Sequence, residues 1–241
     1  MTLSYQEAAN TAVVFKYGEG SQAIVAGLNT IKLPGATRQI IEVKEFRQVS
    51  RQFAGSASRT NLEFGGNAVF NDPGQLLMKT YFDANTKFGP VGDSNGECRI
   101  YLNGTSATLL SSDFIGLDTA NDTESIMQVG SYDFPSTDVD GMFPFSASLT
   151  VGGQYAIYTA HITGTGIAIV DASPSTITDS NNGFVDAGFV AGMTVIIEGS
   201  TADDGIYATI ATVAAGTLTF DSDLDFTGET AGESITIHGG K

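Results

Sequence analysis

Short runs of alternating apolar and polar residues, separated by glycine and other turn residues, fill most of the chain. Alternation with a period of two is typical of strands that have one buried face. The pattern predicts strands at residues 11–17, 21–28, 30–33, 41–44, 61–70, 98–102, 105–115, 125–134 and 142–151. Hairpin turns are predicted at residues 18–20 and at Asn103 and Gly104, the strongest two-residue hairpin signal in the chain.

One segment follows a helical period instead. Asp72 precedes Pro73, and a carboxylate at this position can accept a hydrogen bond from an unpaired amide at the start of a helix, where proline forfeits no bond. Downstream, apolar residues recur three and four positions apart, among them Leu77 and Tyr81. We predict one short helix that ends near Asn85 and lies against a sheet.

A polar stretch at residues 45–58 separates two of the predicted strands. Its arginine and aromatic residues, together with the next arginine, are Phe46, Arg47, Arg51, Phe53 and Arg59. Long ordered loops are often functional, and arginine and aromatic residues are enriched in protein interfaces. We interpret this stretch as a loop that forms a contact arm. The alternative is a solvated loop whose ion pairs each contribute about 0–1 kcal/mol.

After residue 166 a second group of short strands is predicted, at residues 195–198, 205–213, 217–220 and 234–238. The apolar side chains for a small core are Phe184, Val185, Phe189 and Met193. Residues 155–163 form a short strand or a linker, and the glycine-rich residues 164–166 mark a boundary. The predicted domains are therefore residues 1–155, a linker at 156–166, and a second small all-β domain, a sandwich or barrel, at 167–241.

Charge is distributed unevenly along the chain. Residues 1–99 hold 10 of the 11 lysines and arginines against 9 acidic residues, whereas residues 100–241 hold one lysine against 18 acidic residues. A net charge of −16 argues against binding of nucleic acid by neutralisation of phosphates, although DNA can pass such a surface without being held. The N-terminal residues lack the pattern of a signal peptide, and no run approaches the roughly 20 apolar residues of a membrane span. We expect a protein made in a cytoplasm, without membrane insertion.

No set of residues has the spacing of a catalytic or metal site. The two histidines, His161 and His238, lie in different predicted domains, and the single Cys98 is expected to be a buried, inert thiol. The alternating acidic residues at 221–225 do not continue into a calcium loop, because the glycine and glutamate that such a loop requires are missing. We expect no enzyme activity, no cofactor and no metal.

Several short motifs occur in an order and spacing that resemble one known family. They are AIVAGL at residues 23–28, LPG at 33–35, IEV at 41–43, FAG at 53–55, FGGN at 64–67 and NDPG at 71–74, followed by Gly141 and residues 146–152. Over residues 1–155 the chain resembles the major tail tube proteins of long-tailed bacteriophages, the siphoviruses. The resemblance implies an all-β tail tube fold of the β-sandwich or barrel type with one short helix. The C-terminal module resembles, more loosely, small β modules of phage virion proteins.

In the family that this sequence resembles, subunits form hexameric rings that stack into a tube around the tape-measure protein, and the tube later conducts DNA. The resemblance therefore implies a structural virion protein of the tail, assembled in the host cytoplasm, with tail-tip and tail-terminator proteins as further partners. The five residues of the contact arm become candidate contacts between subunits and stacked rings. An acidic lumen would keep DNA from adhering, and Asp133, Asp138 and Asp140 are the candidates to face it.

The C-terminal module is expected on the outer surface of such a tube, where it covers the tube or makes weak contact with the host surface or a glycan. Two other classes of protein remain as alternatives. One is an extracellular β-sandwich adhesin or carbohydrate-binding module without a role in assembly. The other is an enzyme of the β-sandwich type, for which the sequence offers no set of catalytic residues.

Overall fold

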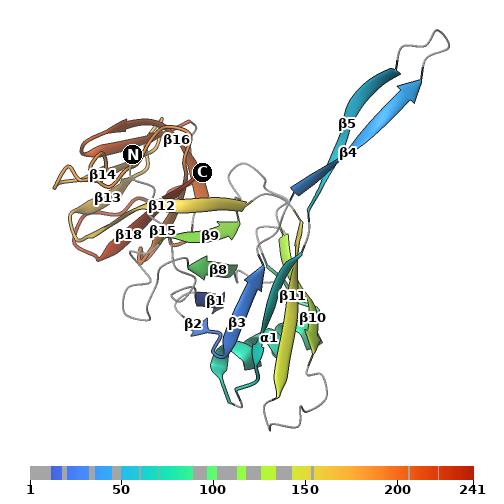
Figure 1. Cartoon of the computed structure of the whole chain (residues 1–241). Helices are drawn as coiled ribbons and strands as arrows, with labels where there is room; N and C mark the ends of the chain where they lie inside the picture. Colours follow the sequence, from blue (N-terminus) through green and yellow to red (C-terminus); the bar gives the residue numbers. More distant parts are fainter. Residues whose placement is uncertain are drawn as a thin grey trace. The chain divides into compact units, whose positions relative to one another are not determined.

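The structure is a computed structural model of the chain and describes residues 12–17, 21–32, 36–44, 50–59, 61–69, 71–88, 97–101, 113–117, 126–133, 143–152, 155–205, 207–221 and 223–241. Strands dominate, and α1 is the one helix in these ranges (Figure 1). The predicted fold class, all-β with one short helix and a further small β part, is confirmed. No helix of the described residues is long and apolar enough to cross a membrane.

The elements, in chain order, are β1 (Ala12–Tyr17), β2 (Ser21–Ile24), β3 (Leu28–Lys32), β4 (Ala36–Lys44), β5 (Ser50–Arg59), β6 (Leu62–Asn67), α1 (Pro73–Asp83), β7 (Lys87–Phe88), β8 (Glu97–Tyr101), β9 (Phe114–Leu117), β10 (Ile126–Asp133), β11 (Pro144–Gly152), β12 (Tyr155–Gly164), β13 (Ile167–Val170), β14 (Thr176–Asp179), β15 (Thr194–Glu198), β16 (Tyr207–Ala214), β17 (Thr217–Phe220) and β18 (Ile235–Gly240).

The chain folds into two compact units, each made of segments that are distant in sequence. The first unit contains Met1–Val25, Phe88–Ile126 and Gly153–Lys241, and the second contains Ala26–Lys87 and Met127–Gly152. These units do not coincide with the predicted domains, because strands from both sides of the predicted linker lie in the first unit. The predicted boundary remains a prediction about which segment can fold or be removed independently.

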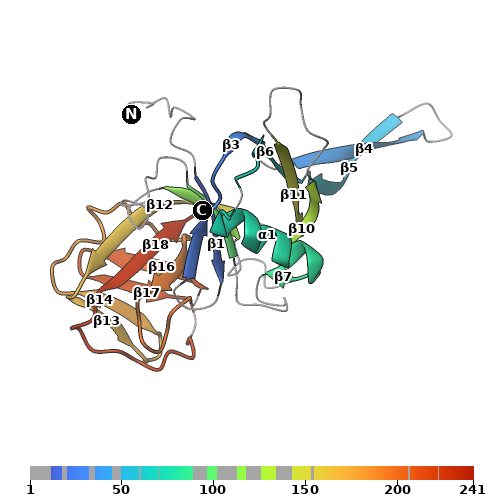
Figure 2. The ribbon, with the colours of Figure 1, turned by 90° about the horizontal axis from the view of Figure 1, so that it is seen from below.

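The second unit is built on a five-stranded sheet in the order β3-β6-β11-β10-β7 (Figure 2). β6 and β11 are antiparallel, and β11 alternates between buried and more exposed residues along its length. The buried apolar side chains of β6, β10 and β11 are Leu62, Phe64, Met127, Val129, Phe145, Ala147, Leu149 and Val151. One face of this sheet is therefore buried, as the alternation in the sequence predicts.

Helix α1 begins and ends where the sequence predicts. Asp72 is its N-cap and accepts a hydrogen bond at Oδ2 from the amide of Gln75 at 2.8 Å. The side chains of Met78 and Tyr81 are buried and give the helix its apolar face. Beyond the helix, Asn85 accepts a hydrogen bond from the side chain of Gln128 on β10, which fastens the end of the helix to the sheet.

The first unit is built on an eleven-stranded sheet in the order β13-β14-β17-β16-β15-β18-β12-β9-β8-β1-β2. The first predicted hairpin is present as the antiparallel pair β1 and β2, and Cys98 on β8 is buried as predicted. β12, predicted as a short strand or a linker, is a ten-residue strand that pairs with β9 on one side and β18 on the other. It therefore joins strands of both predicted domains in one sheet.

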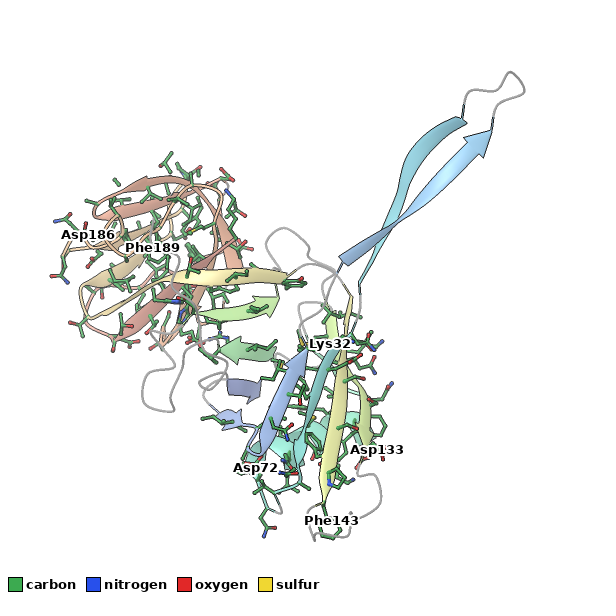
Figure 3. All side chains as sticks on the ribbon, in the orientation of Figure 1. Lys32, Asp72, Asp133, Phe143, Asp186 and Phe189 are labelled. Carbon is green, nitrogen blue, oxygen red and sulfur yellow. The ribbon has the colours of Figure 1, made fainter. Side chains whose placement is uncertain are left out.

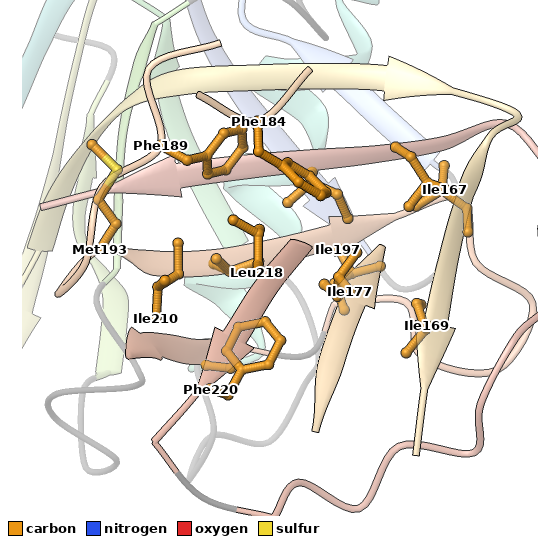
Figure 4. Packing of buried hydrophobic residues seen from close by; sticks show 14 of the residues in the cluster. Ile167, Ile169, Ile177, Phe184, Phe189, Met193, Ile197, Ile210, Leu218 and Phe220 are labelled. Carbon is orange, nitrogen blue, oxygen red and sulfur yellow. The ribbon is translucent and has the colours of Figure 1, made fainter. Parts of the chain in front are cut away.

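Strands β13 to β18 enclose an apolar core (Figure 4). Phe184, Phe189 and Met193 are buried in it as predicted, whereas the prediction for Val185 is wrong, because its side chain is 55 % exposed. Adjacent residues of a turn point in different directions, and here only the phenylalanine of each GFV sequence in residues 183–190 is buried. The sequence therefore predicts three of these four core residues correctly.

The two central strands of the first unit, β15 and β18, are buried along their whole length. On β15, Val195 and Ile197 pack into the core of Figure 4, whereas Ile196 packs on the opposite side, in a second cluster. The buried residues of that second cluster are Tyr101, Phe114, Ala156, Tyr158 and Ile196. Because both faces are covered, any polar side chain on these strands must find a partner inside the protein.

Candidate functional site

The predicted contact arm is a β-hairpin and not a loop. Residues 50–59 form β5, which is antiparallel to β4 over almost its whole length. The loop prediction is wrong because β5, with the sequence SRQFAGSASR, is defined by backbone pairing and shows no apolar alternation. Of the contact candidates, Arg51, Phe53 and Arg59 lie on β5, whereas Phe46 and Arg47 fall outside the described residues.

β4 and β5 pair with each other and, within the described part of the chain, with no third strand. Each strand therefore presents one row of backbone donors and acceptors along its outer edge. Unpaired strand edges are templates for association with another chain. An isolated two-stranded hairpin is also only marginally stable in water. This hairpin is therefore a candidate surface for contact with a second copy.

The exposed face of the five-stranded sheet is a second candidate surface. Its hydroxyl side chains are Thr30, Ser131, Ser146, Ser148 and Thr150. Lys32 on this face forms an ion pair with Glu63 on the neighbouring strand, at 3.0 Å between Nζ and Oε2 (Figure 3). The side chains named here are polar, and the charges of Lys32 and Glu63 offset each other.

Asp133, one of the three predicted lumen acids, is exposed at the end of β10 (Figure 3). Ser131 shares a hydrogen bond with Ser148 on the exposed face, whereas the ring of Tyr132 contacts Phe145 on the buried face at 5.4 Å between centroids. The alternation of β10 breaks after the buried Val129, because Gly130 and Ser131 both adjoin Ser148 on the exposed face. From Tyr132 onwards, alternation places Asp133 on the exposed face. The other two candidates, Asp138 and Asp140, fall outside the described residues.

The FGGN and NDPG motifs, which carry much of the family resemblance, form the joint between the sheet and helix α1. Asp72 accepts a second hydrogen bond from the amide of Ala26, and the side chain of Gln75 donates to the carbonyl oxygens of Ala26 and Asn67. Gly66 passes so close to the neighbouring strand that a Cβ there would lie 2.1 Å from a carbonyl oxygen. These motifs therefore specify local packing.

A buried polar network crosses the first unit. His161 Nδ1 lies 2.9 Å from His238 Nδ1, and the Nε2 atoms face carboxylates: His161 faces Asp113 at 3.3 Å, and His238 faces Glu198 at 3.1 Å. Arg99 completes the network with an ion pair of 2.7 Å to the other oxygen of Glu198. Arg99 and His238 are at most 1 % exposed, whereas the side chain of Asp113 is 36 % exposed, so the network runs from the interior to the surface.

The network shows how strongly the sheet curves. Arg99 on β8 and Glu198 on β15 are separated by β9, β12 and β18 in the strand order. Four steps of about 4.8 Å would place them about 19 Å apart in a flat sheet. Their side-chain contact therefore requires the sheet to curl around the ring of Phe114, which lies 4.6 Å from the Arg99 guanidinium carbon.

The sequence does not reveal the histidine pair, because the two residues are 77 positions apart and were assigned to different predicted domains. A β-bulge adds to the difficulty. The register between β12 and β18 shifts between Tyr158 and Ala160, so that Tyr158 and His161 share one side while Ala160 belongs to the core of Figure 4. Bulges redirect side chains in this way and break the alternation from which faces are predicted.

Burial decides the protonation of this network. It lowers the pKa of His161, and the hydrogen bond and charge of Asp113, together with a hydrogen bond to the backbone of Tyr158, oppose this only in part. It also lowers the pKa of His238, with Glu198 opposing and Arg99 reinforcing the change. No group of three or more histidine, cysteine or acidic residues within the described ranges is arranged to hold a metal ion.

No protein-family model and no curated protein matches the sequence. Among solved structures, the chain is similar to the tail of an empty gene transfer agent particle with C6 symmetry, with 12 % identity, a TM-score of 0.42, and coverage of 63 % of this chain and 97 % of that one. It is similar to a chain of the six-fold symmetrised baseplate of the anti-feeding prophage, with 13 % identity, a TM-score of 0.42, and coverage of 64 % and 97 %. The tube-terminating cap of the anti-feeding prophage gives 14 % identity, a TM-score of 0.41, and coverage of 65 % and 93 %. Likenesses of this degree carry no conclusion about what this chain assembles with.

Proposed function

We propose that the chain is a structural subunit of a phage-like tail tube, in which six copies form a ring and the rings stack. The observation that carries the proposal is the β4–β5 hairpin, whose strands pair only with each other in the described part of the chain. Contact with a neighbouring copy would cover the outer edges of this hairpin and supply the stability that two strands lack alone.

The exposed face of the five-stranded sheet is proposed to line the lumen. Hydroxyl groups keep this face hydrated, and its lysine is already paired with Glu63. DNA binds proteins mainly through phosphate contacts with lysine and arginine, so a lysine that is already paired offers it little. Asp133 adds negative charge at one end of the same face. DNA could then pass without adhering.

The further partners that we propose are a tape-measure protein inside the tube and tail-tip and tail-terminator proteins at its ends, in a virion tail assembled in the host cytoplasm. Residues 167–241 are proposed to lie on the outer surface of the tube, because a folded segment of this size would block the bore. A weak contact with a host surface or glycan is one role for them. The proposal thus assigns the lumen to the five-stranded sheet and the outer surface to residues 167–241.

Electron microscopy of hairpin variants tests the proposal. In one variant, Asn-Gly replaces residues 39–56 and joins Arg38 to Ala57, which are partners in the register. We expect the unaltered protein, concentrated alone or with a tail-tip complex, to form rings or tubes with six-fold end views. The shortened variant should keep its melting temperature and a β-type circular dichroism spectrum, reduced only by the deleted strand residues, but form neither rings nor tubes.

Two control variants separate the hairpin strands from other effects. Replacing only residues 45–49 with Asn-Gly keeps the partners Lys44 and Ser50 and tests the connection by itself. Lys79→Ala changes an exposed residue of the helix and should assemble normally. Tubes formed by the shortened variant would reject the hairpin as the contact. An unaltered protein that stays monomeric with and without a tail-tip complex would reject the tail-tube function and favour the binding-module class.

A further inference from the structure

The four side chains Asp113, His161, His238 and Glu198 form a line with three hydrogen-bonding contacts, of 3.3, 2.9 and 3.1 Å in that order. Each contact requires one hydrogen between its two atoms. Ionised carboxylates supply none, and a neutral imidazole carries a hydrogen on only one of its two nitrogens. Two neutral histidines therefore supply two hydrogens for these three contacts, and a hydrogen bond from His161 to the backbone of Tyr158 also draws on them. The line is therefore at least one hydrogen short.

We propose that the two histidines form a binding site for a single additional proton, held between their Nδ1 atoms. With this proton, each Nε2 donates to its carboxylate and one Nδ1 donates to the other across 2.9 Å. The three distances permit a hydrogen bond at each contact, so the arrangement accommodates the loaded site.

The charges around the site fit one extra proton. Arg99 from β8 and Glu198 from β15 form an ion pair at one end, and Asp113, which precedes β9, faces the other end. One guanidinium and one imidazolium then oppose two carboxylates, so the loaded network is neutral. Without the proton, the network carries one net negative charge, and water reaches it at Asp113, whose side chain is 36 % exposed.

A metal ion fits this site less well than a proton. Each His nitrogen would lie about 2.0–2.1 Å from a zinc ion, which in a tetrahedral site places two such nitrogens roughly 3.3 Å apart, and the ion would need two further ligands. The Nδ1 atoms are closer than this, and the described residues include no third donor arranged for a metal. The short contact therefore fits a shared hydrogen better than a shared metal ion.

Loading depends on pH in a defined direction. Since burial is the largest influence on both rings and lowers the pKa of each, the folded chain takes up the proton at a lower pH than the ordinary histidine value of 6.5. The unfolded chain binds protons more readily in this range, so folded-state stability falls as the pH drops from 6.5 towards the lowered pKa. It continues to fall below that pKa, because the unfolded chain protonates both histidines whereas the folded site holds one proton. Near neutral pH the site is empty, and acidification fills it.

Magic-angle-spinning NMR of protein labelled with ¹⁵N-histidine tests the site in monomers or tubes alike. The chain has only two histidines, so histidine labelled in the ring alone marks just their four ring nitrogens. As the pH is lowered from 8 to 4, we expect both rings to change together in one transition that takes up one proton. A scalar coupling between the two Nδ1 atoms, measured on the unaltered chain, should appear in the loaded state and report the shared hydrogen directly.

The variant His161→Gln adds a second readout. It should move the midpoint of His238 by about one pH unit or more, because coupled groups titrate as a pair. Two rings that titrate independently, or a loaded state without the Nδ1 coupling, would overturn the proposal. Ring signals that change on addition of EDTA would assign the site to a metal ion instead. None of these outcomes depends on whether the protein forms tubes.

Discussion

The sheets of the two units bury their side chains in different ways. In the second unit, β11 alternates regularly, with one covered face and one polar face open to solvent. In the first unit, β15 and β18 are covered on both faces, and their polar residues include Glu198 and His238. The open face tolerates polar residues because water satisfies them. The covered strands tolerate polar residues only where other side chains of the protein form hydrogen bonds or ion pairs with them. These polar residues therefore require one particular packing of the surrounding strands.

The largest expected effect comes from removing the cation of the buried network. Arg99→Ala takes away the ion-pair partner of Glu198, which is itself buried. Breaking a buried pair from one side typically costs about 3–5 kcal/mol, because the remaining charge stays uncompensated. Urea unfolding followed by circular dichroism should show a loss of this size in the free energy of unfolding.

The control for this prediction is Lys79→Ala. Lys79 pairs with Asp83 on the exposed surface of helix α1, and exposed pairs of this spacing contribute about 0.3–0.5 kcal/mol. If Arg99→Ala lowers the free energy of unfolding no more than Lys79→Ala does, polar residues on covered strands do not depend on their partners more than exposed ones do. Residues 167–241 would then be as separable as the sequence predicts. A large loss would show that this segment supplies partners which the strand bearing Arg99 needs.

A medium effect is expected where two strands of the second unit approach each other closely. In Gly66→Ala the new Cβ would lie 2.1 Å from the carbonyl oxygen of Gly27, so the backbone must shift. Overpacking of this kind costs about 1–3 kcal/mol. The adjacent Gly65→Ala is the matched control, because its Cβ would meet only Thr30 at 3.7 Å, an ordinary contact. Equal melting temperatures for the two variants would contradict the close approach.

The sequence predicts the elements of both sheets best where apolar residues alternate or follow a helical period. The first hairpin, helix α1, β10 and β11 and the strands from β15 to β18 lie close to their predicted positions. β5 was missed because its polar and small residues carry no periodicity, and its pairing with β4 is made by the backbone. Apolar periodicity therefore predicts strands that have a buried face, and it does not predict a strand without an apolar face.

The candidate sites also differ in whether a local pattern in the sequence predicts them. The N-cap at Asp72 was predictable because its partners are adjacent in sequence. The histidine pair was not, because 77 residues and a register shift in β12 separate the two rings. Strand order decides which distant residues meet, and no local pattern encodes that order. Arg51, Phe53 and Arg59 have a place on β5, and their role as subunit contacts remains a prediction.

The smallest expected effect on stability, and the sharpest test of the open face, is Asp133→Lys. An exposed substitution should change the free energy of unfolding by no more than about 0.5 kcal/mol. If this face lines the lumen, the added lysine recurs in every subunit of a ring, and tubes should retain short duplex DNA at low salt and release it as salt rises. Asp186→Lys makes the same charge change at an exposed turn of the first unit and should retain no DNA if that segment lies outside the bore. Co-sedimentation of labelled DNA with tubes measures both, and equal retention by the two variants would remove Asp133 from the lumen.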